Sequence, residues 1–113
     1  MSIPTPYGPS GSEPFYRQLS PTCGLRVSPI ALGTLTFGGG EGNHMGELDA
    51  AGAAELLARA HEAGVNLIDT ANLYGGGVAE EVLGGALKKL DCAGDFLVTT
   101  KARMGIGEGP NDG

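Results

Sequence analysis

Three polar residues with complementary chemistry, Asp69, Tyr74 and Lys101, lie at or just beyond the ends of apolar runs. Asp69 lies at the end of one run, Tyr74 follows in the segment after it, and Lys101 ends the next run. A lysine ammonium beside a phenol favours the phenolate form, which makes the hydroxyl a usable proton donor near neutral pH. A nearby carboxylate would keep the lysine charge from being unpaired in a pocket. A tyrosine in this setting can act as a general acid, for example by giving its proton to a carbonyl oxygen while hydride arrives at the carbon.

Each of these residues alone also has an ordinary structural explanation. An aspartate at a strand end often caps a turn, and a tyrosine often packs with its hydroxyl at the surface. A lysine at a strand end is often simply solvated. The joint occurrence of the three after two successive strands favours a functional site, although composition and spacing alone leave the two interpretations nearly even.

Three apolar runs, at residues 30–32, 65–70 and 96–101, predict short strands separated by helices. The order β-α-β-α-β is typical of a parallel sheet with right-handed crossovers, as in a Rossmann-like sheet or a barrel. Neighbouring strands lie about 4.8 Å apart, and alternate side chains share a face. We therefore expect Asp69 and Lys101 to form an ion pair, with the Tyr74 hydroxyl near the ammonium.

Two helices are predicted between these strands. Asp49 can cap the first helix, and Gly64 supplies its left-handed stop. Acidic residues open the second helix and lysines close it, as the helix dipole favours. The expected apolar stripes are Ala53, Leu56, Leu57, Ala60 and Ala63 in the first helix, and Val78, Val82, Ala86, Leu87 and Leu90 in the second.

The composition narrows the classes of function. The chain has 113 residues and a net charge of -6, with its basic residues scattered, so nucleic acid is not an expected partner. No apolar run approaches the roughly 20 residues of a membrane span, and no signal peptide is visible, so we expect a cytoplasmic protein without a membrane partner. Cys23 and Cys92 are expected to be free thiols. His44 and His61 lack partners at ligand spacing, so no metal site is expected.

A series of short motifs gives a more specific indication. Ala-Leu-Gly-Thr at 31–34, Ala-Gly-Val-Asn at 63–66 and Asp-Thr-Ala-x-x-Tyr-Gly at 69–75 precede Thr-Thr-Lys at 99–101. In this order they resemble the aldo-keto reductase superfamily, most closely the branch that holds bacterial oxidoreductases and the β subunits of voltage-gated potassium channels. The resemblance extends from residue 16 to about residue 103.

The resemblance implies an NADPH-dependent enzyme that reduces aldehydes and ketones to alcohols on an α/β fold, the (β/α)8 barrel. Tyr74 matches the family's proton donor, Lys101 the residue that activates it, and Asp69 the carboxylate that pairs with the lysine. Metal ligands are not implied, and a small carbonyl compound is the implied partner. The implied cofactor-binding residues are Gly33, Thr34, Leu35 and Asp69.

The resemblance also implies an incomplete barrel, because such a barrel takes about 250 residues. The expected organisation is a disordered segment at 1–15, a hairpin (16–27) with three strands and two helices at 16–103, and a Gly-rich loop or truncated tail at 104–113. No residue matches the family's catalytic histidine, so the chain is expected to be inactive alone. A homo-oligomer is possible. The alternatives are a non-catalytic nucleotide-binding subunit, as among channel β subunits, and a small α/β module that folds independently.

Overall fold

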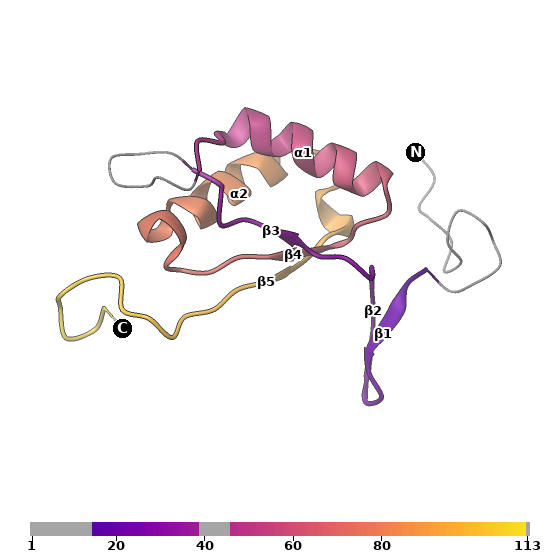
Figure 1. The fold of residues 1–113 in the computed structure, drawn as a ribbon, viewed down its shortest axis with the longest axis horizontal. Helices are drawn as coiled ribbons and strands as arrows, with labels where there is room; N and C mark the ends of the chain where they lie inside the picture. Colours follow the sequence, from indigo (N-terminus) through magenta and orange to yellow (C-terminus); the bar gives the residue numbers. More distant parts are fainter. Residues whose placement is uncertain (1–14, 39–45, 113) are drawn as a thin grey trace.

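The computed structural model describes residues 15–38 and 46–112, and its elements follow the expected α/β order (Figure 1). A two-stranded hairpin precedes three strands and two α-helices, and two short 3-10 helices lie in the connections. Most of the segment predicted to be disordered, and His44, lie outside the described residues. The elements are β1 (Arg17–Ser20), β2 (Cys23–Val27), β3 (Leu32–Gly33), α1 (Ala50–Glu62), β4 (Leu67–Asp69), η1 (Tyr74–Gly77), α2 (Val78–Lys88), η2 (Ala93–Asp95) and β5 (Leu97–Thr99).

The three later strands form one parallel sheet in the order β3-β4-β5. Leu32 pairs with Ile68, and Ile68 pairs with Val98, so these side chains share the sheet face that α1 and α2 cover. Asp69 and Thr99 are paired on the opposite face. The prediction of adjacent parallel strands in chain order is therefore confirmed, and the arrangement is part of a (β/α)8 barrel.

The strands are shorter than the apolar runs that predicted them. Ile30 is 69% exposed and lies before β3, because the Ser28 hydroxyl donates to the Ile30 carbonyl and holds that segment in a bend. The Val65 N–H donates to the Ala60 carbonyl at 2.9 Å, so Val65 is bonded back to the last turn of α1 and is not part of β4. Side-chain and helix-end hydrogen bonds thus compete with the sheet for these backbone groups.

The predicted helices are present, but their buried stripes differ from those expected. Asp49 accepts a hydrogen bond from the Gly52 N–H at 2.8 Å and caps α1, and Gly64 follows the helix with a φ of 88°. Leu56 is 37% exposed, and Val78 is 36% exposed, so neither belongs to the core. Each helix packs against both the sheet and the other helix, which brings small residues inward. The buried residues are Ala53, Ala54, Leu57 and His61 in α1, and Ala79, Leu83 and Ala86 in α2.

The hairpin is antiparallel, as predicted, and is joined to the amino end of β4 through Asn66. The side-chain oxygen of Asn66 accepts from the Ser28 N–H at 2.8 Å, and the side-chain nitrogen of Asn66 donates to the Arg26 carbonyl at 3.0 Å. The Asn66 N–H donates in turn to the Ser28 hydroxyl at 3.1 Å. This network fixes the hairpin at the end of the sheet opposite to the carboxyl ends of the strands (Figure 1).

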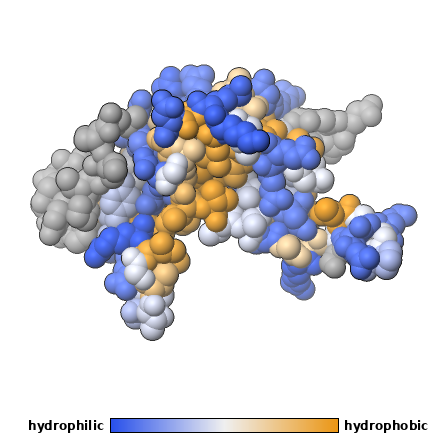
Figure 2. All heavy atoms as spheres, turned by 180° about the vertical axis from the view of Figure 1, so that it is seen from behind, coloured by the Kyte–Doolittle hydropathy of each residue, from blue (hydrophilic) through white to orange (hydrophobic). Residues whose placement is uncertain are grey.

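Part of the apolar surface remains uncovered. Figure 2 shows apolar atoms gathered over the middle of one face and down onto the hairpin. Val98 of β5 is 47% exposed although its paired residue Ile68 is fully buried, so the helix-covered face of the sheet is less well covered at β5 than at β4. Cys23 and Cys92 are both free, as predicted. Within the described ranges, no helix combines the length and the apolar character that a membrane span requires.

Candidate active site

The carboxyl ends of β4 and β5 bring Asp69 and Lys101 together. Asp69 is the last residue of β4 and is paired with Thr99, so Lys101 lies two residues farther along the same face. The Lys101 ammonium donates to Asp69 Oδ2 at 2.8 Å, with side chains that are 50% and 42% exposed respectively. The predicted ion pair is confirmed.

Both oxygens of the Asp69 carboxylate have donors. The Thr99 hydroxyl donates to Oδ1 at 2.7 Å, opposite the bond from Lys101 to Oδ2. The hydrogen bond from Lys101, followed by that from Thr99, lowers the pKa of Asp69. The Lys101 ammonium also donates to the Thr70 carbonyl at 2.8 Å. These bonds hold Asp69 ionised and fix the direction of the lysine side chain.

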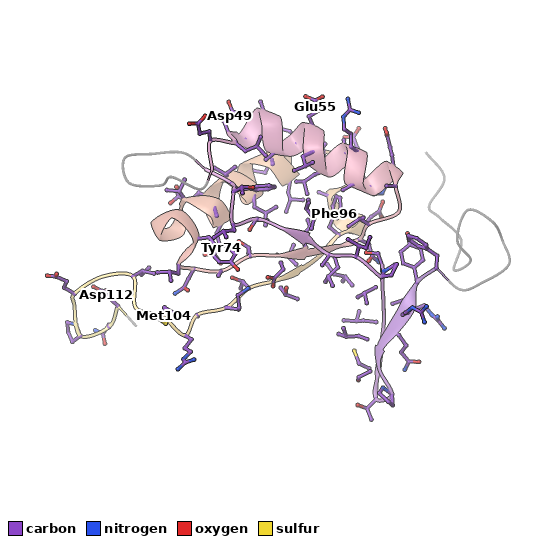
Figure 3. All side chains as sticks on the ribbon, in the orientation of Figure 1. Asp49, Glu55, Tyr74, Phe96, Met104 and Asp112 are labelled. Atoms are coloured by element: carbon purple, nitrogen blue, oxygen red, sulfur yellow. The ribbon has the colours of Figure 1, made fainter. Side chains whose placement is uncertain are left out.

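Tyr74 lies beside this ion pair at the start of η1, near the carboxyl ends of the strands (Figure 3). The Lys101 ammonium is 5.1 Å from the centre of the Tyr74 ring, within cation–π range. The hydrogen bond to Asp69 raises the pKa of Lys101, and interaction with Tyr74 raises it further. The chain turns from Tyr74 into α2 through Gly75, Gly76 and Gly77, whose φ values of 60°, 65° and 103° favour glycine.

The residues expected at the nicotinamide end of the cofactor differ in their exposure. Gly33 is paired with Asp69, and a Cβ at this position would meet no heavy atom within 4 Å among the described residues. Leu35 is 41% exposed. The Thr34 side chain is fully buried, and its backbone N–H donates to the Asp69 carbonyl at 3.0 Å. Gly33 therefore lies opposite Asp69 with open space at its missing Cβ, and Leu35 is partly exposed, whereas the Thr34 hydroxyl is buried.

Several site contacts were not predicted from the sequence. The Thr100 hydroxyl donates to Glu80 Oε1 at 2.5 Å, and the Asn72 N–H donates to the Lys101 carbonyl at 3.0 Å. The Asn72 side chain donates to the Met104 carbonyl, also at 3.0 Å. The available signal was the proximity of these residues in sequence to Tyr74 and Lys101. The contacts join the segment after β4 to the segment after β5.

A second polar cluster lies on the side of the hairpin. His61 Nε2 is 2.9 Å from Asp95 Oδ2, with the histidine side chain only 7% exposed. The His61 ring meets Phe96 edge-on, with ring centres 5.8 Å apart. Burial, and to a smaller extent Asp95, raises the pKa of Tyr16. Sequence analysis did not predict this cluster, which belongs to the packing between α1 and the chain before β5.

Comparisons with known proteins place the chain among aldo/keto reductases. The sequence profile of the aldo/keto reductase family matches residues 29–113. Norsolorinic acid reductase A of Aspergillus parasiticus is 39% identical over 105 residues, which are 93% of this chain and 27% of that protein. The NADP(+) aryl-alcohol dehydrogenase of Phanerodontia chrysosporium is 39% identical over 87 residues, covering 76% of this chain and 23% of that protein.

A solved structure gives the same result. A protein of Pseudomonas aeruginosa described as an aldo-keto reductase, PA4992, superposes with a TM-score of 0.61 at 40% sequence identity. The match covers 80% of this chain and 31% of that protein. The chain thus spans about a quarter of the length of the curated relatives named above.

Proposed function

This chain belongs to the aldo/keto reductase family, and we propose that it carries the proton-transfer part of the active site of an NADPH-dependent oxidoreductase that reduces aldehydes or ketones to alcohols. The observation that carries the proposal is the position of the Lys101 ammonium, bonded to Asp69 at 2.8 Å and 5.1 Å from the centre of the Tyr74 ring. In this arrangement the phenol can donate a proton. The ammonium, held by the carboxylate, places a positive charge beside the phenol.

Each of the three side chains has a defined task in this reaction. NADPH, when bound, supplies hydride to the carbonyl carbon. The Tyr74 hydroxyl donates its proton to the carbonyl oxygen as negative charge develops there. The Lys101 ammonium stabilises the phenolate that remains, and Asp69 holds the ammonium in place through the bond to Oδ2. In the alcohol-oxidising direction the phenolate accepts the proton.

The cofactor fits the open space next to the carboxylate. Gly33 lies opposite Asp69 in the sheet, and none of the side chains that the structure describes occupies the space that its missing Cβ leaves. Leu35 presents an exposed apolar side chain in the next turn of the chain. We assign the backbone of 33–34 and the side chain of Leu35 to contact with the nicotinamide end, and Asp69 to its polar edge.

An enzyme is favoured over a non-catalytic nucleotide-binding subunit. A subunit that only binds nucleotide has no chemical need for a proton donor with a charged lysine beside it. The chain keeps all three side chains in contact at the carboxyl ends of the strands, the edge where barrel enzymes hold their active sites. The names of two relatives, norsolorinic acid reductase and aryl-alcohol dehydrogenase, favour an aromatic carbonyl compound as the substrate.

The test requires a chain of the family's length. In the chimera that we call the completed enzyme, residues 29–113 replace the segment that they match in the aryl-alcohol dehydrogenase of Phanerodontia chrysosporium. We expect NADPH oxidation, followed by absorbance, upon addition of an aromatic aldehyde such as benzaldehyde. A completed enzyme that binds NADPH and shows no turnover with any of a panel of aldehydes and ketones would favour the regulatory alternative.

A further inference from the structure

Glu80 and Thr100 join the two segments that carry the proposed proton donor and its lysine. The Thr100 hydroxyl donates to Glu80 Oε1 at 2.5 Å. Glu80 lies in the first turn of α2, six residues after Tyr74, and Thr100 immediately precedes Lys101. This contact is therefore a direct side-chain link between the start of α2 and the chain that leaves β5.

The direction of the Lys101 side chain follows from this link. Successive side chains of an extended chain point to opposite sides. Thr99 and Lys101 both donate to the Asp69 carboxylate, whereas Thr100 between them donates to Glu80 on α2. A rotation of this segment that released Thr100 from α2 would also turn Lys101 away from Asp69.

Beyond Thr99, the backbone of this segment is held by one bond to the chain after β4, from the Asn72 N–H to the Lys101 carbonyl at 3.0 Å, and the Thr100 side chain adds a bond to α2. Residues 101–112 form no helix or strand, and they are exposed along their whole length. A lysine side chain has four rotatable bonds and loses rotamer freedom when it is fixed. A hydrogen bond to a carboxylate is about twice as strong as one between neutral groups, so Glu80 is a suitable acceptor for the Thr100 hydroxyl.

We propose that Glu80 is a positioning residue for the reaction: by holding Thr100 against α2, it fixes Lys101 toward Asp69 and the Tyr74 ring. Glu80 is not assigned a contact with substrate or cofactor. It acts through Thr100, the residue that immediately precedes Lys101. The catalytic consequence rests on the function proposed above, whereas the geometric consequence does not.

Two pairs of substitutions isolate the contact. Glu80→Ala removes the acceptor, and Glu80→Gln retains an oxygen acceptor without the charge. Thr100→Val removes the donor at almost constant volume, and Thr100→Ser retains it. The matched control is Glu81→Ala, which removes the same charge from the same turn of α2 at an exposed position.

In the completed enzyme, we expect Glu80→Ala and Thr100→Val each to lower kcat about tenfold, with KM for NADPH changed less than about twofold, since small misplacements of a catalytic group slow the chemical step. Glu80→Gln and Thr100→Ser should retain most of the activity. The double variant Glu80→Ala with Thr100→Val should be no slower than either single variant, because both remove one interaction.

A second measurement on the 113-residue chain separates this proposal from the proposed function. Titration of the Lys101 ammonium by NMR should show a pKa closer to that of an ordinary lysine in Glu80→Ala and in Thr100→Val than in the unaltered chain, with no change in Glu81→Ala. If the completed enzyme has no turnover, the proposed function fails and this titration still decides the positioning role.

Unchanged Lys101 titration and unchanged kcat in both variants would overturn the proposal. An effect of Glu81→Ala equal to that of Glu80→Ala would also overturn it, because the helix dipole would then explain the result. If Glu80→Ala does not fold, Thr100→Val decides both measurements, since Thr100 is exposed and the substitution is nearly isosteric.

Discussion

The Lys101 ammonium lies 2.8 Å from Asp69 Oδ2, although the two residues are 32 positions apart in the chain. The parallel pairing of β4 with β5 places both residues at one edge of the sheet. The Thr99 hydroxyl donates to the second carboxylate oxygen of Asp69, Oδ1. The pair lowers the pKa of Asp69 and raises that of Lys101, chiefly through their mutual hydrogen bond. The same two side chains are the support that the proposed proton donor needs.

The pair should make stability depend on pH at both extremes. Because the pKa of Asp69 is lowered, its ionised carboxylate stabilises the fold at pH values above the ordinary aspartate pKa of about 4. This stabilisation is lost as the pH falls through the lowered pKa. Because the pKa of Lys101 is raised, its ammonium stabilises the fold at pH values below the ordinary lysine pKa of about 10.4. This stabilisation is lost as the pH rises through the raised pKa.

The measurement is the difference in urea midpoint between the unaltered chain and Lys101→Met. It should be constant between about pH 5 and 9 and shrink outside that range. High salt should reduce it, since both side chains are about half exposed. A difference that is unaffected by pH would show that Lys101 and Asp69 are not coupled.

Two adjacent leucines of α1 should differ in how much they contribute to the free energy of unfolding. Leu57 is fully buried, and Leu56 is 37% exposed. Leu57→Ala should lower the free energy of unfolding by about 2 to 5 kcal/mol, the range for a large-to-small change in a packed core. Leu56→Ala should cost less than about 1 kcal/mol. Equal losses in urea unfolding would contradict the observed orientation of the helix.

The attachment of the hairpin depends on the Asn66 side chain. Asn66→Ala removes a partly buried bond to the Ser28 N–H and an exposed bond to the Arg26 carbonyl. The change should cost about 1 to 3 kcal/mol, chiefly because the Ser28 N–H is left without its acceptor. Hydrogen exchange at the Ser28 amide should accelerate. The control is Asn72→Ala, which removes a bond to the Met104 carbonyl at the other end of the sheet. Faster exchange at Ser28 in Asn72→Ala would show that the attachment is not local.

Local patterns were sufficient to predict the order of the elements and the Asp69–Lys101 pair. Asp49 marks the start of α1 through its side chain, and Gly64 marks the end through its positive φ. Strand alternation places Asp69 and Lys101 on one face. The parallel β-α-β-α-β arrangement then follows from the apolar runs.

Contacts that depend on particular side chains, and not on strand alternation or a single helix face, could not be predicted in this way. The stripe that included Leu56 assumed one contact face, whereas α1 packs against both the sheet and α2. The bend at Ile30 depends on a side-chain bond from Ser28 that competes with the sheet. The contact between Glu80 and Thr100 joins a helix to the end of a strand. The position of Glu80 in the sequence indicated only a favourable negative charge at the start of a helix.

Lys101 should be nearly as important for catalysis as the proton donor itself. In the completed enzyme, Lys101→Met should lower kcat by about 10² to 10⁴, the usual contribution of general acid catalysis, because the phenolate loses its neighbouring charge. The affinity for NADPH, measured by fluorescence, should change much less. If Lys101→Met lowered NADPH affinity and left kcat unchanged, the lysine would be a cofactor ligand and not the support of Tyr74.

The most direct test of the account is the rate of aldehyde reduction by the completed enzyme carrying Tyr74→Phe. The substitution keeps the ring near the Lys101 ammonium and removes only the hydroxyl. We expect kcat to fall by about 10² to 10⁴ while NADPH binds with nearly unchanged affinity, because the hydroxyl acts only as charge develops on the carbonyl oxygen. An enzyme with Tyr74→Phe that retains the full kcat on a reactive aldehyde would show that the proton comes from another group, and would contradict the assignment of this site.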